Sequence, residues 1–408
     1  MLLAVAACGD DDDSASDEDE TAVENAADLL GPEDPAEGEP VRIGMITDGQ
    51  TPNFDNRDEA RSAEAAAEFW NERRGGVGGQ PVEVVVCETV ADPATATDCG
   101  NQMVEQEVVA VALSQSAVTE QVWEPINEAG IPMFLLQASG EELAADDETT
   151  FLMTNPTSTL FGIPVTTAEE EGADHIAFVT IDVPVALTQF ESVGPTVLEN
   201  AGMDYDLVRI PPGTADMTSQ MGEVANSDAG VAHVVGNDAF CVAAFNGLAA
   251  VGFEGAITAV SQCITDATRE GVPEGGLEGI RITATMAVGD TEDSAYQLYQ
   301  AVMGEYGDDV EDVENALAMG GYTVMSSLLA SLEGIEGDIT PENVAETIRT
   351  MDETEYPGAD GVTFQCGGSA FESLPAVCTN QSLAATLDAE GNPASYEAVD
   401  FTDLLEGL

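Results

Sequence analysis

Side chains that carry chemistry are scarce in this sequence, with the exception of carboxylates. The 408 residues include 78 acidic residues, 9 basic residues, which are all arginine, and two histidines, His175 and His233. Without lysine, the chain can form neither a Walker-type phosphate loop nor a Schiff base. The sequence also has no Gly-x-Ser-x-Gly and no His-Glu-x-x-His motif. We therefore predict that the protein is not an enzyme and binds neither a cofactor nor a metal.

The two histidines are far apart in the sequence, and each stands beside apolar residues. We expect both to be structural. Paired carboxylates act as general acid and base in some hydrolases, and the sequence does not exclude such a pair. Among 78 acidic residues, however, carboxylates that are close in sequence carry no information. An exported hydrolase therefore stays an alternative function.

The charge of the chain is extreme, with a formal net charge of -69 at pH 7. Nucleic-acid-binding proteins neutralise phosphates with clustered Lys and Arg, so we predict no nucleic-acid partner. Two interpretations of the acidity remain open. It can be a solubility adaptation of the whole surface, as in proteins from saline habitats or lysine-poor proteomes. Alternatively, its field can steer a cationic ligand into a cleft.

The start of the chain contains small residues followed by a cysteine. The sequence Val5-Ala6-Ala7-Cys8, followed at once by Gly9 and four aspartates, resembles the lipobox of bacterial lipoproteins, whose cysteine is acylated. The resemblance implies that residues 1–7 are the remnant of a signal peptide and that Cys8 anchors an extracytoplasmic protein to the cell membrane. No Lys or Arg precedes Cys8, as a leader would require, and the alternative is an ordinary cysteine in a frayed terminus.

Residues 8–40 are dominated by Asp, Glu, Ala, Gly and Pro. Such a composition is too charged and too poor in apolar residues to bury a core, so we predict a disordered acidic tether. No later stretch has the roughly 18 continuous apolar residues that a spanning helix needs.

Six cysteines remain when Cys8 is reserved for lipid. They form three sequence-local pairs, Cys87 with Cys99, Cys241 with Cys263, and Cys366 with Cys378. An even number of cysteines in an exported protein favours disulfides. Each bond would close a loop of about 12 to 22 residues and contribute roughly 3 kcal/mol in the chain-entropy model. A zinc cluster would require closer, CxxC-like spacing.

From residue 41, short β-branched runs alternate with longer amphipathic segments, which is typical of βαβ units and parallel sheets. The first series has predicted strands at 41–46, 82–87, 108–113 and 133–136, and helices at 57–73, 94–107 and 119–129. The second has predicted strands at 176–180, 206–210, 231–235, 256–260 and 282–285, and helices at 193–201, 216–225 and 239–251. Three helices at 294–306, 316–332 and 341–350 follow, and the tail from Val362 suggests a stapled hairpin or loop.

Two α/β series of similar size predict two Rossmann-like lobes, each with its own parallel sheet. Parallel sheets bind ligands outside the carboxyl ends of their strands. Two lobes that face each other would place the site between them. The glycines at 75, 76, 78 and 79 follow a predicted helix, so we expect them to form a turn and not a phosphate loop.

In the order of its predicted elements and in several short stretches, the chain resembles the type 1 periplasmic binding proteins, specifically the substrate-binding lipoproteins of branched-chain-amino-acid-type ABC transporters. The matching stretches are Val41-Arg42-Ile43-Gly44, the segment 69–79, Glu128-Ala129-Gly130-Ile131-Pro132-Met133, the segment 171–177, and Gly320-Gly321-Tyr322. The resemblance implies an α/β fold of two lobes joined by a three-crossing hinge. Lobe 1 would take residues 41–156 and 286–355, and lobe 2 would take residues 157–285 and 356–408.

The resemblance also implies a function. An ABC permease would be the partner, and an amino acid or a related small polar solute would be captured in the cleft between the lobes. A ligand-sensing receptor-type binding protein of the same fold is the alternative, since its sequence would look the same.

In that family, hydroxyls and backbone amides at two turns of the first lobe hold the ligand's carboxylate. Ser116 lies at the first corresponding turn, and Ser139, with Gln137 beside it, at the second. A hydroxyl and exposed N–H groups at a helix N-terminus favour an anion. A plain helix cap is the alternative for each serine.

The second lobe departs from the family pattern of an acidic and an aromatic residue around the ligand's ammonium group. The candidates at the corresponding turns are Asp182, Asn237, Asp238 and Gln262, with Ser261 or Gln262 in place of the expected Glu. The departure favours an amide, a short peptide or another small polar solute over an ordinary α-amino acid. The loop 48–54, including Thr51, is expected to add a wall to the pocket.

Overall fold

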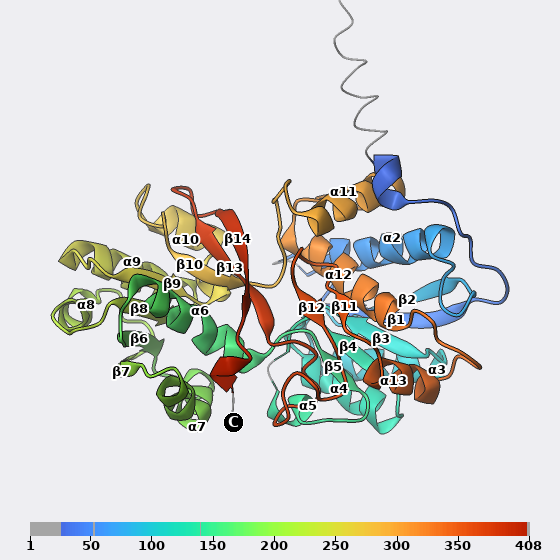
Figure 1. Cartoon of the computed structure of the whole chain (residues 1–408), viewed down its shortest axis with the longest axis horizontal. Coiled ribbons are helices and arrows are strands. Elements are labelled where there is room, and N and C mark those ends of the chain that lie inside the picture. Colours follow the sequence, from blue (N-terminus) through green and yellow to red (C-terminus); the bar gives the residue numbers. More distant parts are fainter. Residues whose placement is uncertain (1–25, 52–53, 139, 406–408) are drawn as a thin grey trace, which may run out of the picture.

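The computed structural model describes residues 26–51, 54–138 and 140–405 of the chain. Two α/β lobes lie side by side, and the chain passes between them more than once (Figure 1). The two-lobed α/β fold predicted from the sequence is confirmed. Cys8, the proposed signal-peptide remnant at 1–7 and Ser139 lie outside the described residues.

Lobe 1 is built on a five-stranded parallel sheet with the order β2-β1-β3-β4-β5. Its strands are β1 (Val41–Thr47), β2 (Val82–Glu88), β3 (Ala110–Leu113), β4 (Met133–Leu135) and β5 (Thr150–Leu152). Its helices are α2 (Arg57–Arg73), α3 (Pro93–Glu105), α4 (Thr119–Glu128), α5 (Glu141–Ala144), α11 (Ser294–Tyr306), α12 (Ala316–Ser331) and α13 (Pro341–Arg349). Residues of α2, α11 and α12 pack on one face of the sheet, and residues of α3 and α4 pack on the other.

Lobe 2 is built on a seven-stranded sheet with the order β14-β13-β10-β9-β8-β6-β7. Its strands are β6 (His175–Ile181), β7 (Asp204–Ile210), β8 (Val231–Val235), β9 (Ala256–Ala259), β10 (Arg281–Ala284), β13 (Gln381–Leu387) and β14 (Pro393–Asp400). Its helices are α6 (Pro156–Glu171), α7 (Pro184–Asn200), α8 (Thr218–Ala225), α9 (Asp238–Val251) and α10 (Asp266–Gly271). Five strands are parallel, and the hairpin β13–β14 adds two antiparallel strands at one edge.

Helices α2 and α12 of lobe 1 pack with almost no space between their backbones. A side-chain carbon added at Gly321 would lie 1.8 Å from the backbone oxygen of Glu59. The Ser62 hydroxyl donates a hydrogen bond to the Ala318 carbonyl at 2.5 Å, directly between the two helices. Only glycine fits such an approach, which explains the glycine at position 321 inside the long apolar helix α12.

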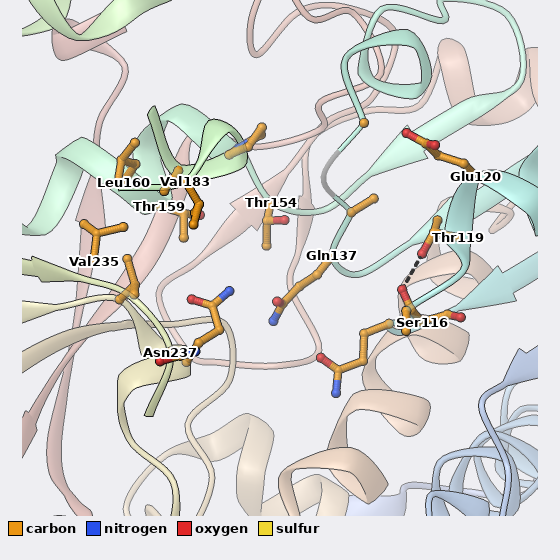
Figure 2. Close-up of a pocket in the computed structure, with 18 of the residues that line it drawn as sticks. Ser116, Thr119, Glu120, Gln137, Thr154, Thr159, Leu160, Val183, Val235 and Asn237 are labelled. Atoms are coloured by element: carbon orange, nitrogen blue, oxygen red, sulfur yellow. Dashed lines mark hydrogen bonds between the residues drawn. The ribbon is translucent and has the colours of Figure 1, made fainter. Parts of the chain in front are cut away.

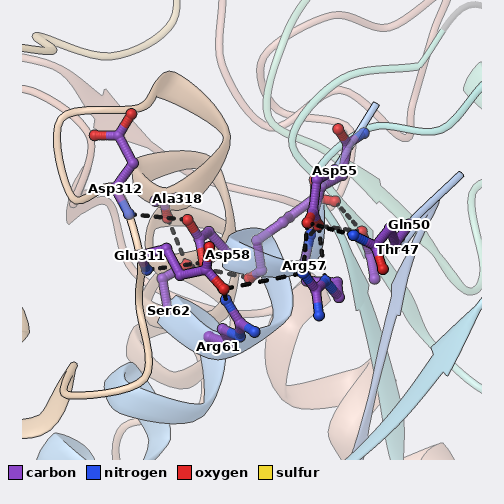
Figure 3. A network of polar contacts seen from close by, with 12 residues as sticks. Thr47, Gln50, Asp55, Arg57, Asp58, Arg61, Ser62, Glu311, Asp312 and Ala318 are labelled. Atoms are coloured by element: carbon purple, nitrogen blue, oxygen red, sulfur yellow. Dashed lines mark hydrogen bonds and ion pairs between the residues drawn. The ribbon is translucent and has the colours of Figure 1, made fainter. Parts of the chain in front are cut away.

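An ionic network fixes the N-terminal half of α2 to the loop before α12 (Figure 3). The Asp58 carboxylate accepts hydrogen bonds from the backbone N–H groups of Glu311 and Asp312, both at 3.0 Å. The Arg61 guanidinium bridges Asp58 at 2.8 Å and Glu311 at 3.0 Å. The network compensates for acidic residues that would otherwise repel one another at this corner.

The chain crosses between the lobes three times: between β5 and α6, between β10 and α11, and just before β13. Two of the crossings are joined by a hydrogen bond of 2.9 Å from Asn155 Nδ2 to Asn380 Oδ1, and both residues are buried. The third crossing is joined to lobe 1 by a hydrogen bond of 3.3 Å from Gln137 Nε2 to Thr285 Oγ1. The structure therefore has the three-crossing connection that the family resemblance implies.

The N-terminal segment corrects one boundary. We predicted a disordered tether over residues 8–40, but residues 26–30 form a helix and Leu30 is buried. The Arg73 guanidinium donates to the Gly31 carbonyl at 3.0 Å, and the Ala36 N–H donates to the Asn71 carbonyl at 2.7 Å. The end of the acidic segment is thus held on the surface of lobe 1 by backbone hydrogen bonds, which composition alone does not reveal.

The C-terminal segment corrects another boundary. We assigned residues 356–408 to lobe 2, but residues 356–380 pack in lobe 1. Phe364 contacts Phe134 edge-on, and the Cys378 N–H donates to the Leu152 carbonyl at 2.8 Å, which extends the lobe 1 sheet beyond β5. The hairpin β13–β14 joins the lobe 2 sheet, and Phe401 and Leu404, which follow it, pack in the lobe 2 core.

All three predicted disulfides are present, with sequence separations of 12, 22 and 12 residues. The bond between Cys241 and Cys263 joins the first turn of α9 to the turn that follows β9. Both sulfurs are buried in the core of lobe 2.

Replacing Cys241 and Cys263 together by alanine should lower the free energy of unfolding by about 3 kcal/mol, because the unfolded chain regains the freedom of a 22-residue loop. Urea unfolding of the oxidised proteins measures the difference. When all disulfides are reduced, the loop is open in the wild-type protein as well. The difference in unfolding free energy between the two proteins should then be smaller. An unchanged midpoint in the oxidised state would contradict the prediction.

Candidate functional site

A cleft of about 810 Å³ opens between the lobes. Its described walls come from the carboxyl ends of strands in both lobes and from the crossing before α6. The lobe 1 wall is formed by Gln115, Ser116, Ala117, Thr119, Glu120, Gln121, Gln137, Ala138, Gly140 and Leu143. The opposite wall is formed by Thr154, Pro156, Thr159, Leu160, Ile181, Val183, Ala186, Pro212, Val235, Gly236, Asn237, Val260 and Gln262. Figure 2 shows Ser116 and Gln137 on one side facing Asn237 and Thr159 on the other.

The described lining is polar but nearly uncharged. Five side-chain amides and four hydroxyls line the cleft, together with aliphatic side chains mostly from lobe 2. Glu120 is the single charged residue among the described lining residues, and no arginine or histidine is among them. Such a surface offers many hydrogen bonds and some apolar contact, but no cation to neutralise an anionic ligand.

The turn between β3 and α4 forms the lobe 1 end of the cleft. The Ser116 hydroxyl donates to Asp48 Oδ1 at 2.6 Å, and the Ala117 N–H donates to Asp48 Oδ2 at 3.1 Å. A third donor, the Thr89 hydroxyl, reaches Asp48 Oδ1 at 2.6 Å. Asp48 is the residue directly after β1, and it is only 6% exposed. An internal carboxylate therefore takes the donors that we assigned to a ligand.

A second buried carboxyl group lies beneath the same turn. Glu59, on α2, is fully buried, and its Oε2 lies 2.5 Å from the Thr47 hydroxyl. Burial raises the pKa of Glu59 to about 7, the hydrogen bonds from Thr47 and Ser114 oppose the rise, and the charge of Asp48 adds to it. The lobe 1 wall thus rests on a carboxyl group that titrates near neutral pH.

The lobe 2 wall presents Asn237 and Gln262. Asn237 caps α9, since its Oδ1 accepts a hydrogen bond from the Phe240 N–H at 3.1 Å. Gln262 is exposed in the short turn 261–263, and it has no hydrogen-bond partner among the described residues. The disulfide between the neighbouring Cys263 and Cys241 of α9 holds these two turns together. Covalent support of this kind reduces the entropy that ordering the wall would cost on binding.

The structure brings together four of the residues predicted from the sequence, which are Ser116, Gln137, Asn237 and Gln262. Asp182, Asp238 and Thr51 are not among the described residues that line the cleft. Asp238 instead accepts a hydrogen bond from the Ala239 N–H at the start of α9, and Asp182 is exposed beyond the end of β6.

Several lining residues were missed by sequence reasoning. Thr119, Glu120 and Gln121 begin α4 directly after Ser116, so their position in the first turn of that helix could have indicated them. Thr154 and Thr159 flank the first crossing, where no periodic pattern marks which side chains face the cleft. Asp48 was considered only as part of a loop, because its contacts with residues 89, 116 and 117 are far apart in sequence.

The histidines lie away from the cleft. His233 is fully buried in β8, where Nδ1 lies 2.8 Å from the Thr258 hydroxyl and burial lowers the pKa of the imidazole to about 3. His175 is the first residue of β6, at the end of the strand away from the cleft. Its Nε2 lies 3.2 Å from Asp206 Oδ2. In the part of the chain that the structure describes, no group of three or more His, Cys, Asp or Glu side chains could hold a metal ion.

The two-lobed architecture and the cleft are matched by a known family. A model described as periplasmic binding protein matches residues 40–380. The chain belongs to this family of periplasmic binding proteins. The family comprises solute-binding proteins, so the predicted family and the prediction that the chain is not an enzyme are both confirmed.

Solved structures share the fold of this binding protein at low sequence identity. A putative branched-chain amino acid ABC transporter from Rhodospirillum rubrum has a TM-score of 0.69 and 16% identity, covering 89% of this chain and 100% of the other. The substrate-binding protein LivJ from Streptococcus pneumoniae, in complex with isoleucine, has a TM-score of 0.64 and 16% identity, covering 88% and 99%. A solute-binding protein from R. palustris, in complex with 4-hydroxybenzoate, has a TM-score of 0.65 and 17% identity, covering 89% and 97%. No curated protein matches the chain.

The raised pKa of Glu59 predicts a pH-dependent stability. The folded state favours the protonated carboxyl group, so its stabilising effect is complete below the ordinary value of 4.5 and is lost as the pH rises through about 7. Relative to Glu59→Gln, the wild-type protein should lose roughly 3 kcal/mol of unfolding free energy between pH 4.5 and pH 8. Urea unfolding at a series of pH values measures this difference.

Glu59→Gln removes only the Glu59 carboxyl group, so the difference between the two profiles reports Glu59 together with its coupling to Asp48. Parallel profiles for the wild-type protein and Glu59→Gln would show that Glu59 ionises at its ordinary value.

Proposed function

We propose that this binding protein captures a small polar solute in its cleft and delivers it to an ABC permease. The observation that carries the proposal is the cleft itself, whose polar side chains come from both lobes of a chain in the periplasmic binding protein family. A solute that contacts both walls is held best when the lobes close, and this difference in affinity is what drives closure.

The lining favours an amino-acid-like or amide-like solute. Amides and hydroxyls on both walls supply hydrogen bonds to a polar group, and the aliphatic residues of lobe 2, such as Leu160, Val183 and Val235, supply contact for a modest apolar part. Two solved structures of this fold are complexes with isoleucine and with 4-hydroxybenzoate, so the fold admits solutes of this size.

The location that accompanies this role is outside the cytoplasm, at the membrane. No helix in the described ranges is both long and apolar enough to serve as a membrane span. We propose that a lipid on Cys8 provides the anchor and that the acidic segment before residue 26 keeps the binding protein close to its permease, where tethering raises the effective concentration. Mass spectrometry of the mature N-terminus, for an acylated Cys8, tests the anchor.

A thermal-shift panel of amino acids, their amides, urea, polyamines and short peptides tests the proposed function. A solute present at about 100 times its dissociation constant should add roughly 2.7 kcal/mol of stability. Small-angle scattering with the best solute should show a more compact protein, because the lobes close. A panel in which no solute changes the transition would contradict the proposal for these compound classes.

Gln262→Ala should weaken binding of the best solute roughly five- to tenfold, because one hydrogen bond from the lobe 2 wall is lost. The matched control is Gln297→Ala, since Gln297 donates to the Thr291 carbonyl on the outside of lobe 1 and does not line the cleft. Isothermal titration calorimetry measures both. Equal affinities of Gln262→Ala and the wild-type protein would remove Gln262 from the site.

A further inference from the structure

Asp48 occupies an unusual position immediately behind the lobe 1 wall. It follows the last residue of β1, and the chain then turns at Gly49, which has a φ of +61°. A side-chain carbon at Gly49 would lie 2.5 Å from the Glu88 side chain, so the turn depends on glycine. This tight turn aims the Asp48 carboxylate at the turn between β3 and α4 and keeps it out of the described lining.

The contacts of Asp48 determine what Ser116 can offer to a ligand. The single hydroxyl proton of Ser116 is donated to Asp48 Oδ1 at 2.6 Å. Ser116 Oγ in turn accepts a hydrogen bond from the Val118 N–H at 3.1 Å. A serine hydroxyl has one proton and two lone pairs, so Ser116, which lines the cleft, keeps one lone pair as an acceptor and no proton to donate. The Ala117 N–H is likewise already used, by Asp48 Oδ2.

The charges around this turn have the same sign. The Asp48 carboxylate is held by two hydroxyls and one backbone N–H, and no arginine of the described residues pairs with it. Glu120 is the charged residue of the described lining, and Glu59 lies beneath the wall. A ligand carboxylate placed at this turn would meet a like charge, with no cation in the described lining to offset the repulsion.

We propose that Asp48 is a specificity-determining residue: it converts the lobe 1 end of the cleft from a donor surface into an acceptor surface. The cleft then selects solutes that present N–H donors there, in the form of a primary amide or an ammonium group, over solutes that present a carboxylate. This inference rests on the proposed solute-binding function and specifies the chemical class of its substrate. Ser116 contacts the solute, and Asp48 acts through it.

Matched pairs of acids and amides test the inference. The probes are 4-hydroxybenzoate with 4-hydroxybenzamide, L-leucine with L-leucinamide, and L-phenylalanine with L-phenylalaninamide, each titrated calorimetrically into the purified protein. For the wild-type protein, at least one amide should bind at least tenfold more tightly than its acid. Asp48→Ala frees the Ser116 proton and the Ala117 N–H, so this preference should fall at least tenfold through a gain in acid binding.

Asp48→Asn keeps the size of the side chain while removing its charge, and it should also gain acid binding. This variant serves as the test if Asp48→Ala folds poorly. Circular dichroism checks the fold of each variant. The matched control is Thr89→Val, which removes another hydrogen bond to Asp48 without releasing the donors at Ser116 and Ala117. This control should keep the wild-type preference within twofold.

If probes bind the wild-type protein but no amide binds more tightly than its acid in any of the three pairs, the inference is overturned. An unchanged ratio in folded Asp48→Ala or Asp48→Asn would overturn it as well. If no probe binds the wild-type protein, the proposed capture of such solutes is contradicted. The variants then still test whether Asp48 excludes acids. Acid binding that appears in Asp48→Ala or Asp48→Asn then supports the inference, and its absence in both overturns it.

Discussion

A hydrogen bond between two buried amides holds the point at which the lobes join. Asn155 and Asn380, which are 2% and 4% exposed, belong to different crossings and contact each other at 2.9 Å. Asn155 also caps α6, and Asn380 directly precedes β13, so both elements that carry the chain into lobe 2 begin at this contact. A buried amide left without its partner costs about 1–3 kcal/mol, so the two crossings hold together. Asn155 lies between Thr154 and Pro156, which line the cleft, so this pair sits where the two walls are joined.

The nine arginines of the chain form their contacts near the surface, so none of them is left to pair with the buried carboxyl groups. Seven of the nine arginines form ion pairs with carboxylates, while Arg73 contacts Tyr306 and the Gly31 carbonyl, and Arg74 lies over the Phe69 ring. The buried acids are consequently held by hydroxyls and backbone N–H groups alone. Asp48 draws its three donors from two separate segments, at residue 89 and at residues 116–117, and burial raises the pKa of Glu59. Polarity at the lobe 1 wall therefore arises from neutral dipoles and not from paired charges.

Sequence patterns predicted the elements well where periodicity was strong. Helix α2 spans the predicted residues 57–73, and the three disulfides pair as sequence proximity indicated. Helix α6 was missed because Pro156 and Pro164 interrupt its pattern, and because its buried face is nearly continuous. At the site, the turn at Ser116 was found because strand-to-helix turns meet at one edge of a parallel sheet. Its partner Asp48 was not, since a contact between residues 68 positions apart leaves no periodic signal.

The path of the last residues has a consequence for how the protein is made. Residues 356–380 complete the lobe 1 core around the Cys366–Cys378 disulfide, and the hairpin β13–β14 then supplies the edge of the lobe 2 sheet. During synthesis, lobe 1 therefore lacks part of its core until residues 356–380 have left the ribosome, and lobe 2 lacks the edge of its sheet until residues 381–400 have followed. Neither lobe can reach its native packing before these residues are available, so the folding of the two lobes is completed together.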